Sequence, residues 1–90
     1  MIETILISKK DISIMDMASI VRKINFFDCD LRFTKGEKTI RANEILNINE
    51  LDIKSGDEIK IRILGRKLDQ EDEIFAHVKS VFDGKRNHEE

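Results

Sequence analysis

The sequence predicts an α+β fold: an open-faced two-layer sandwich in which three helices cover one face of a four-stranded antiparallel sheet. Two observations carry this prediction. Segments in which apolar and polar residues alternate, as they do in half-buried strands, are separated by short turns that contain Gly36 and Gly56. Other segments space their apolar residues as amphipathic helices do. The expected order is strand, helix, strand, strand, helix, strand, helix (βαββαβα).

The first strand is expected over residues 2–7, a short run rich in β-branched residues. Both of its faces are partly apolar, so either Ile5 and Ile7 or Ile2 and Leu6 turn outward. Two interpretations follow from this pattern. The strand either carries a small exposed apolar patch or lies centrally beneath its neighbours.

The first helix is expected to begin after Ser13. Residues 13–16 match a capping box, in which the Ser13 hydroxyl accepts a hydrogen bond from a free backbone N–H and Asp16 returns the bond. Lys23, near the end of the helix, suits the negative end of the helix dipole. The expected inward stripe consists of Ile14, Met17, Ala18, Val21 and Ile24, with Ile20 beside it.

The middle of the chain predicts a hairpin followed by a short helix. Leu31 and Phe33 alternate with polar residues, and a turn at residues 35–37 leads into the next strand. A helix within residues 42–53 is then expected, with Asn43 as its cap. Its inward residues are expected to be Ile45, Ile48 and Leu51, whereas Leu46 and Asn49 face elsewhere.

The last strand and the last helix have the clearest patterns. Residues 58–63 alternate three isoleucines with charged residues, as a strand requires. Residues 69–83 predict a helix whose first turn is acidic, and Gly84 ends it. Its inward stripe is Ile74, Phe75, Val78, Val81 and Phe82. One domain is therefore expected over residues 1–84, followed by a disordered tail over residues 85–90.

Composition narrows the function classes. Ninety residues with 40% apolar content suffice for one core, so a single monomeric domain is the default. The 16 basic and 18 acidic residues are interspersed and give a formal net charge of -2, which argues against a nucleic-acid partner. The single cysteine, Cys29, excludes an internal disulfide, and no cofactor or metal site is expected. A cytoplasmic protein is expected, because no apolar run is long enough for a signal peptide or a membrane span.

The element order, residues 27–33 and the turn at residues 54–59 resemble HPr, the histidine-containing phosphocarrier protein family of the bacterial sugar phosphotransferase system. The resemblance runs from the first strand to about Gly65. It implies the four-stranded, three-helix fold expected above and a protein that is not an enzyme. Ubiquitin-like and ferredoxin-like modules are the alternative families. The chain lacks the C-terminal Gly-Gly of ubiquitin-like sulfur carriers and the cysteines of an iron–sulfur ferredoxin.

The resemblance implies two functional positions. The first is a phosphorylatable histidine at the start of the first helix, followed two residues later by arginine and then by proline; Ser13, Met15 and Asp16 stand at these places. The second is a regulatory serine at the start of the short helix, where Glu44 stands. Glu44 has two interpretations. It is either an acid that suits a helix start or a permanent mimic of phosphoserine.

Phosphohistidine transfer needs an imidazole nucleophile, which Ser13 does not supply, and the nearby carboxylates oppose a phosphate. His77 in the last helix and His88 in the tail are expected to have structural or solvated roles. The first candidate function is therefore a non-catalytic regulatory module that docks on a protein partner through the first and second helices. Its expected contact residues are Ser13, Met15, Asp16, Glu44, Ile45, Leu46 and Asn49. The second candidate is a working phosphocarrier or phosphoprotein that uses Ser13 or another site.

Overall fold

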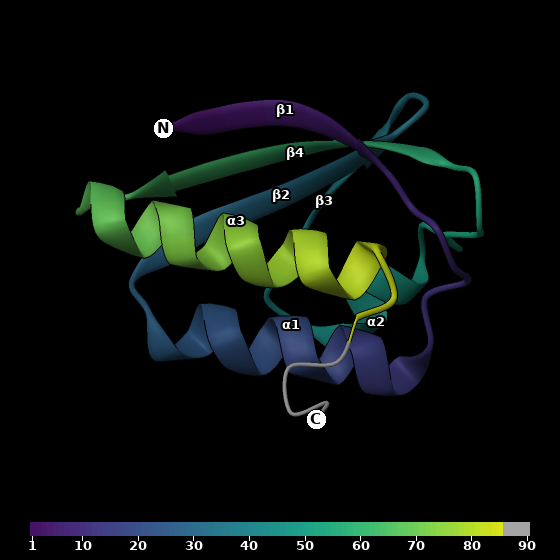
Figure 1. The fold of residues 1–90 in the computed structure, drawn as a ribbon, viewed down its shortest axis with the longest axis horizontal. Coiled ribbons are helices and arrows are strands. Elements are labelled where there is room, and N and C mark those ends of the chain that lie inside the picture. The colour runs from purple at the N-terminus through teal and green to yellow at the C-terminus, as the bar shows by residue number, and fades with distance from the viewer. Residues whose placement is uncertain (86–90) are drawn as a thin grey trace.

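The computed structural model describes residues 1–85 and confirms the predicted α+β sandwich with the order βαββαβα. Figure 1 shows its two layers, with the helices on one side of the sheet. The strands are β1 (Ile2–Ile7), β2 (Cys29–Lys35), β3 (Lys38–Arg41) and β4 (Glu58–Gly65). The helices are α1 (Ile14–Phe26), α2 (Ile45–Asn49) and α3 (Leu68–Phe82). Residues 86–90 of the expected tail lie outside the described residues.

The sheet has the strand order β1-β4-β2-β3, and all of its pairs are antiparallel. In β4, Ile61 pairs with Thr4 of β1 on one side and with Phe33 of β2 on the other. Because β4 occupies the middle, β1 is an edge strand, and its interpretation as a covered central strand is wrong. Ile5 and Ile7 are the residues of β1 that turn outward to solvent.

The core lies between the sheet and the helices. The three isoleucines of β4 and Phe33 of β2 are fully buried, as the alternation in these strands predicts. The ring of Phe33 meets the ring of Phe82 edge to face, with 5.7 Å between centroids. The sheet and α3 are thus joined through aromatic packing.

Gly36 and Gly56 both have positive φ angles, 61° and 94°, which glycine adopts without strain in the two turns.

Helix α1 turns a different face to the core from the one expected. Its buried residues are Met17, Ile20 and Ile24, whereas Ile14 is 61% exposed. The prediction that Ile14 points inward is therefore wrong. The physical reason is that Ile12, in the extended segment before the helix, covers this part of the core and donates its backbone N–H to the Ile53 carbonyl at 3.0 Å.

Helix α2 is shorter than expected and begins one residue later. Its N-cap is Glu44, not Asn43, and the Glu44 side chain makes no capping hydrogen bond. Asn43 instead accepts a hydrogen bond from the Asn47 side-chain amide at 3.1 Å. The predicted orientations are confirmed: Ile48 is buried, Ile45 is half-buried, and Leu46 and Asn49 are exposed, while Leu51, just after the helix, is buried as well.

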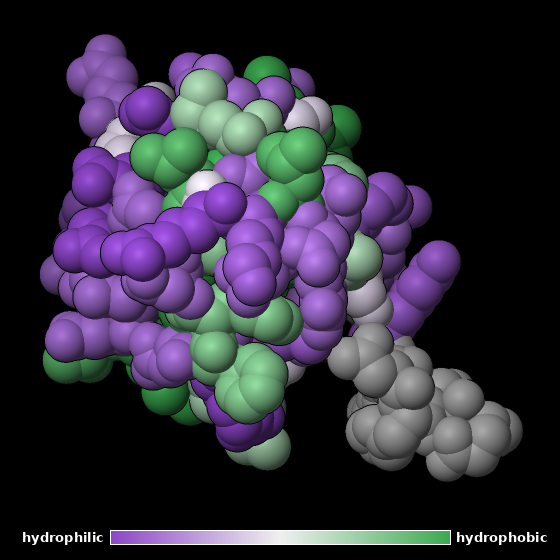
Figure 2. All heavy atoms as spheres, turned by 90° about the vertical axis from the view of Figure 1, so that its left-hand side faces the viewer, coloured by the Kyte–Doolittle hydropathy of each residue, from purple (hydrophilic) through white to green (hydrophobic). Residues whose placement is uncertain are grey.

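Helix α3 packs as its periodicity predicts. It begins and ends one residue earlier in the chain than the expected range of 69–83. Ile74, Val78, Val81 and Phe82 are buried, and Phe75 is half-buried. Figure 2 shows the end of the molecule where α3 starts and α1 finishes. Hydrophobic side chains there form separate small areas among hydrophilic ones, so this end carries no continuous apolar face.

Candidate functional site

The start of α1 is closed by its own side chains. The Ser13 hydroxyl accepts a hydrogen bond from the Asp16 N–H at 3.1 Å, and the Asp16 carboxylate accepts one from the Ser13 N–H at 2.9 Å. Ser13 has the extended backbone typical of an N-cap, with φ -87° and ψ 170°. The predicted capping box is confirmed, and it satisfies two backbone donors that would otherwise face solvent or a ligand.

The carboxylate of Asp16 carries a further bond, an ion pair with the Lys10 ammonium at 2.9 Å. Burial alone would raise the pKa of Asp16, but the hydrogen bond from the Ser13 N–H and the Lys10 ammonium outweigh it, so this pKa lies below its usual value. Asp16 is therefore ionised at neutral pH. Its negative charge stands at the positive end of the α1 dipole, where it opposes the approach of an anion.

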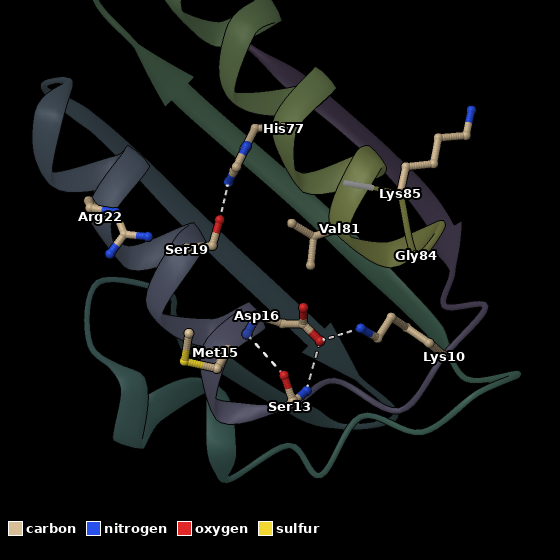
Figure 3. A pocket seen from close by; sticks show the side chains of 10 residues that line it. All are labelled: Lys10, Ser13, Met15, Asp16, Ser19, Arg22, His77, Val81, Gly84 and Lys85. Carbon is tan, nitrogen blue, oxygen red and sulfur yellow. Dashed lines mark hydrogen bonds and ion pairs between the residues drawn. The ribbon is translucent and has the colours of Figure 1, made fainter. Parts of the chain in front are cut away.

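A hollow of about 640 Å³ lies between the start of α1 and the end of α3 (Figure 3). Ser13, Met15 and Asp16 all line it, so the structure brings together three of the predicted site residues. It adds residues that the sequence did not point to. Lys10 comes from the segment before α1, Ser19 and Arg22 come from α1, and His77 and Val81 come from α3. We call this cavity the α1–α3 hollow.

Ser19 of α1 and His77 of α3 face each other across the α1–α3 hollow (Figure 3). The Ser19 hydroxyl and Nε2 of His77 lie 2.8 Å apart and share a hydrogen bond. Desolvation, followed by the charges of Lys23 and Arg22, lowers the pKa of His77 below its usual value, so the neutral imidazole predominates at pH 7. Local pattern could not reveal this pair, because 58 residues separate its members.

The predicted site residues of α2 do not line the α1–α3 hollow. Glu44 and Asn49 are exposed, and Ile45 is half-buried against the core. Leu46 is 72% exposed, and at the start of α1 Met15 is 79% exposed. Helix α1 packs against α2, and Ile14 at the start of α1 is exposed as well. We call Ile14, Met15 and Leu46 the α1–α2 patch.

Over residues 1–85, none of the helices has the length and hydrophobicity of a membrane-spanning segment. Nor does any group of three or more histidine, cysteine, aspartate or glutamate side chains in the described range have an arrangement that could hold a metal ion.

Comparison with known proteins gives a family and several similar structures. A family model described as the PTS HPr component phosphorylation site matches residues 3–83. The phosphocarrier protein HPr of Bacillus anthracis is 23% identical, with a TM-score of 0.75 over 89% of this chain and 94% of that one. HPr-C-His of Thermoanaerobacter tengcongensis is 20% identical, with a TM-score of 0.76 over 96% and 99%.

A third similar structure is Crh, a catabolite repression containing protein of Bacillus subtilis described as a swapped, intertwined dimer. It is 20% identical, with a TM-score of 0.69 over 87% of this chain and 86% of that one. These identities show a shared fold. No curated protein sequence matches the chain. Since the family model covers nearly all of the described residues, the chain belongs to the HPr phosphocarrier family of the phosphotransferase system.

Proposed function

We propose that this chain is an HPr-family protein that does not carry phosphate on Ser13 and acts by docking on a cytoplasmic protein partner. The closed start of α1 is the observation that carries the proposal. A phosphoryl group at a helix start needs free backbone donors and a neighbouring cation. Here the Ser13 and Asp16 N–H groups bond within the capping box, and Lys10 is paired with Asp16.

The chemistry of Ser13 supports the same proposal. A serine hydroxyl becomes a nucleophile when a neighbouring base takes its proton. The carboxylate of Asp16 accepts from the Ser13 backbone N–H, and its lowered pKa makes it a weak base. The hydroxyl oxygen of Ser13 in turn accepts a hydrogen bond from the Asp16 N–H. Both side chains therefore cap the helix, and neither is arranged for phosphoryl transfer.

The proposed docking surface is the α1–α2 patch, with Glu44, Ile45 and Asn49 of α2 beside it. The large apolar side chains of the patch are 61% to 79% exposed. Contact between apolar side chains and water is unfavourable, so a partner that covers them lowers the free energy of the complex. Glu44 adds a fixed negative charge at the start of α2, in the place where the family carries a regulatory serine. Its side chain makes no capping bond, which leaves the carboxylate open to a partner's cation.

A phosphotransfer assay tests the first part of the proposal. The protein is incubated with phosphoenolpyruvate and the general phosphotransferase enzyme, and its intact mass is measured. We expect no added phosphate, whereas a histidine-bearing HPr in the same tube gains one. A gain of one phosphate would establish the alternative, a working phosphocarrier or phosphoprotein, and peptide mapping would then locate the modified residue.

A paired substitution tests the docking surface. Leu46→Asp places a charge in the α1–α2 patch, and Leu68→Asp places the same charge at the start of α3, where the side chain is equally exposed at 74%. We expect Leu46→Asp to lose the proteins that the wild type captures from its native cytosol and Leu68→Asp to keep them. Loss in both variants, or in neither, would contradict the α1–α2 patch as the docking surface.

A further inference from the structure

The open face of the sheet carries a row of three arginines that crosses three neighbouring strands. All three helices lie on the opposite side of the sheet (Figure 1). Arg62 of β4 stands opposite Arg32 of β2, and Arg32 stands opposite Arg41 of β3. All three residues are exposed, and the neighbours of Arg62 and Arg32 within their strands are buried. The three side chains therefore point away from the helices. We call Arg62, Arg32 and Arg41 the arginine row.

The acids of the open face compensate the arginine row only in part. Asp30 pairs with two members of the row, at 2.9 Å and 3.1 Å, so one carboxylate serves two guanidinium groups. Glu3 stands opposite Arg62 in the strand register, but its carboxylate pairs with Lys60 at 3.7 Å. The third acid among the outward-facing strand residues, Glu58, lies about 14 Å from Arg62 along β4. Within residues 1–85, Arg62 takes part in no ion pair.

The arginine row holds like charges opposite one another on adjacent strands. Such pairs destabilise a sheet, because the side chains lie close together across the strands. Arg32 has an arginine opposite it on both sides. A partner that brings carboxylates to the row relieves this repulsion, and a guanidinium can donate two parallel hydrogen bonds to a carboxylate. Carboxylates along the row therefore gain more than they would beside an isolated surface cation.

We propose that the arginine row binds an acidic helix of a partner protein, which lies across the strands. Neighbouring strands are about 4.8 Å apart, so the row is about 10 Å long. A helix rises about 1.5 Å per residue, so carboxylates at positions i, i+4 and i+7 lie on one side of it and span about 10.5 Å. Residues on one face of an extended segment are about 6.8 Å apart, which fits the row less well.

A nucleic acid suits the open face less well than an acidic helix does. Among the outward-facing residues of the four described strands, none is aromatic, whereas single-stranded nucleic acids stack their bases on aromatic side chains. The formal net charge of the chain is -2, which opposes a polyanion. A short acidic helix brings only a few charges, all of which can face the row.

The test is an NMR titration of the isotope-labelled protein at constant ionic strength with two alanine-rich helical peptides of equal composition. In the first peptide three glutamates lie at positions i, i+4 and i+7, and in the second they are distributed around the helix. We expect saturable shifts of the signals of β2, β3 and β4 with the first peptide and weaker binding of the second. Arg62→Gln should weaken binding of the first peptide about fivefold, the contribution of one good exposed charge pair.

Arg66→Gln is the matched control, because it removes the same charge from an 83% exposed side chain outside the arginine row. Equal losses in Arg62→Gln and Arg66→Gln would show that only net charge matters and would overturn the proposal, as would equal binding of the two peptides. Tighter binding of a single-stranded oligothymidine would also overturn it and would assign the row to nucleic acid. Leu46→Asp should bind the first peptide as the wild type does, since the α1–α2 patch lies on the helix side of the sheet. Failure of this proposal is thus distinguishable from failure of the docking proposal.

Discussion

The carboxylate of Glu71 accepts a hydrogen bond from the backbone N–H of Gly65 at 2.8 Å. This bond joins the first turn of α3 to the last residue of β4. The other carboxylate oxygen lies 3.0 Å from the Met1 ammonium, and the side chain is only 3% exposed. The Gly65 N–H first, and then the Met1 ammonium, hold the pKa of Glu71 below its usual value despite burial. A single buried acid therefore ties α3 to the end of β4 and to the residue that precedes β1.

Glu71→Gln should lower the urea midpoint of unfolding. The substitution removes the charge that the Met1 ammonium pairs with, and half of its orientations aim an amide donor at the Gly65 donor. Glu73→Gln is the control, because Glu73 pairs with Lys23 at the surface and exposed pairs contribute little. Equal midpoints for the two variants would show that the buried contacts of Glu71 contribute no more to stability than the exposed ion pair of Glu73.

Glu71 should also make stability fall on acidification. Its folded-state pKa lies below the usual 4.5, so its contribution is present above pH 4.5 and is lost as the pH falls through the folded-state pKa. Urea unfolding of wild type and Glu71→Gln between pH 6 and pH 3 checks this. The difference between the two curves should shrink toward the acid end, and a constant difference would contradict the assignment.

Gly65→Ala should destabilise the protein by about 1–3 kcal/mol, the usual cost of an overpacked site. A Cβ at position 65 would lie 2.5 Å from Cys29 Sγ and 3.3 Å from Glu71 Cγ. Cys29→Ala removes the nearer atom, so the double variant should recover part of the loss. Chemical unfolding of the two single variants and the double variant measures this coupling. Strict additivity would show that Cys29 is not the obstacle.

Ser13→Ala should cost about 0.5–2 kcal/mol, since it removes the acceptor for the Asp16 N–H at the start of α1. Ser55→Ala in the exposed turn before β4 should change stability by less than about 0.5 kcal/mol. Thermal unfolding of both variants provides the comparison. If Ser13→Ala is as stable as Ser55→Ala, the capping box does not hold the helix start closed in solution.

The pair Leu46→Ala and Ile48→Ala tests the orientation of α2. Ile48 is fully buried, so its truncation should cost about 2–5 kcal/mol. Leu46 is exposed, and its truncation should cost less than about 0.5 kcal/mol. Urea unfolding followed by circular dichroism measures both. A large loss for Leu46→Ala would mean that this side chain belongs to the core and not to the α1–α2 patch.

Stability should fall as the pH drops from about 7 to 5.5, because of His77. Its folded-state pKa lies below the usual 6.5, so protons bind the unfolded chain more readily than the folded one in this range. The contribution is present above pH 6.5 and is lost as the pH falls through the folded-state pKa. His77→Asn should flatten the pH dependence of the unfolding midpoint, whereas an unchanged slope would assign it to other groups.

Local patterns predicted most of this fold. The alternating isoleucines of β4 and the heptad-like stripe of α3 both place side chains on one face whatever the neighbours are, and the structure confirms both. The Ser13–Asp16 capping box was equally predictable, because its partners are three residues apart. Ile14 shows where such reasoning fails, since Ile12 competes with it for the same part of the core.

The amino-acid order alone sufficed for the α+β architecture, the closed start of α1 and the outward direction of Leu46, since these depend on backbone periodicity and on partners within a few residues. Tertiary packing settled the edge position of β1, the burial of Glu71 and the meeting of Ser19 with His77. Each of these joins residues that are distant in the chain or depends on which strand becomes central, and no local pattern encodes that choice.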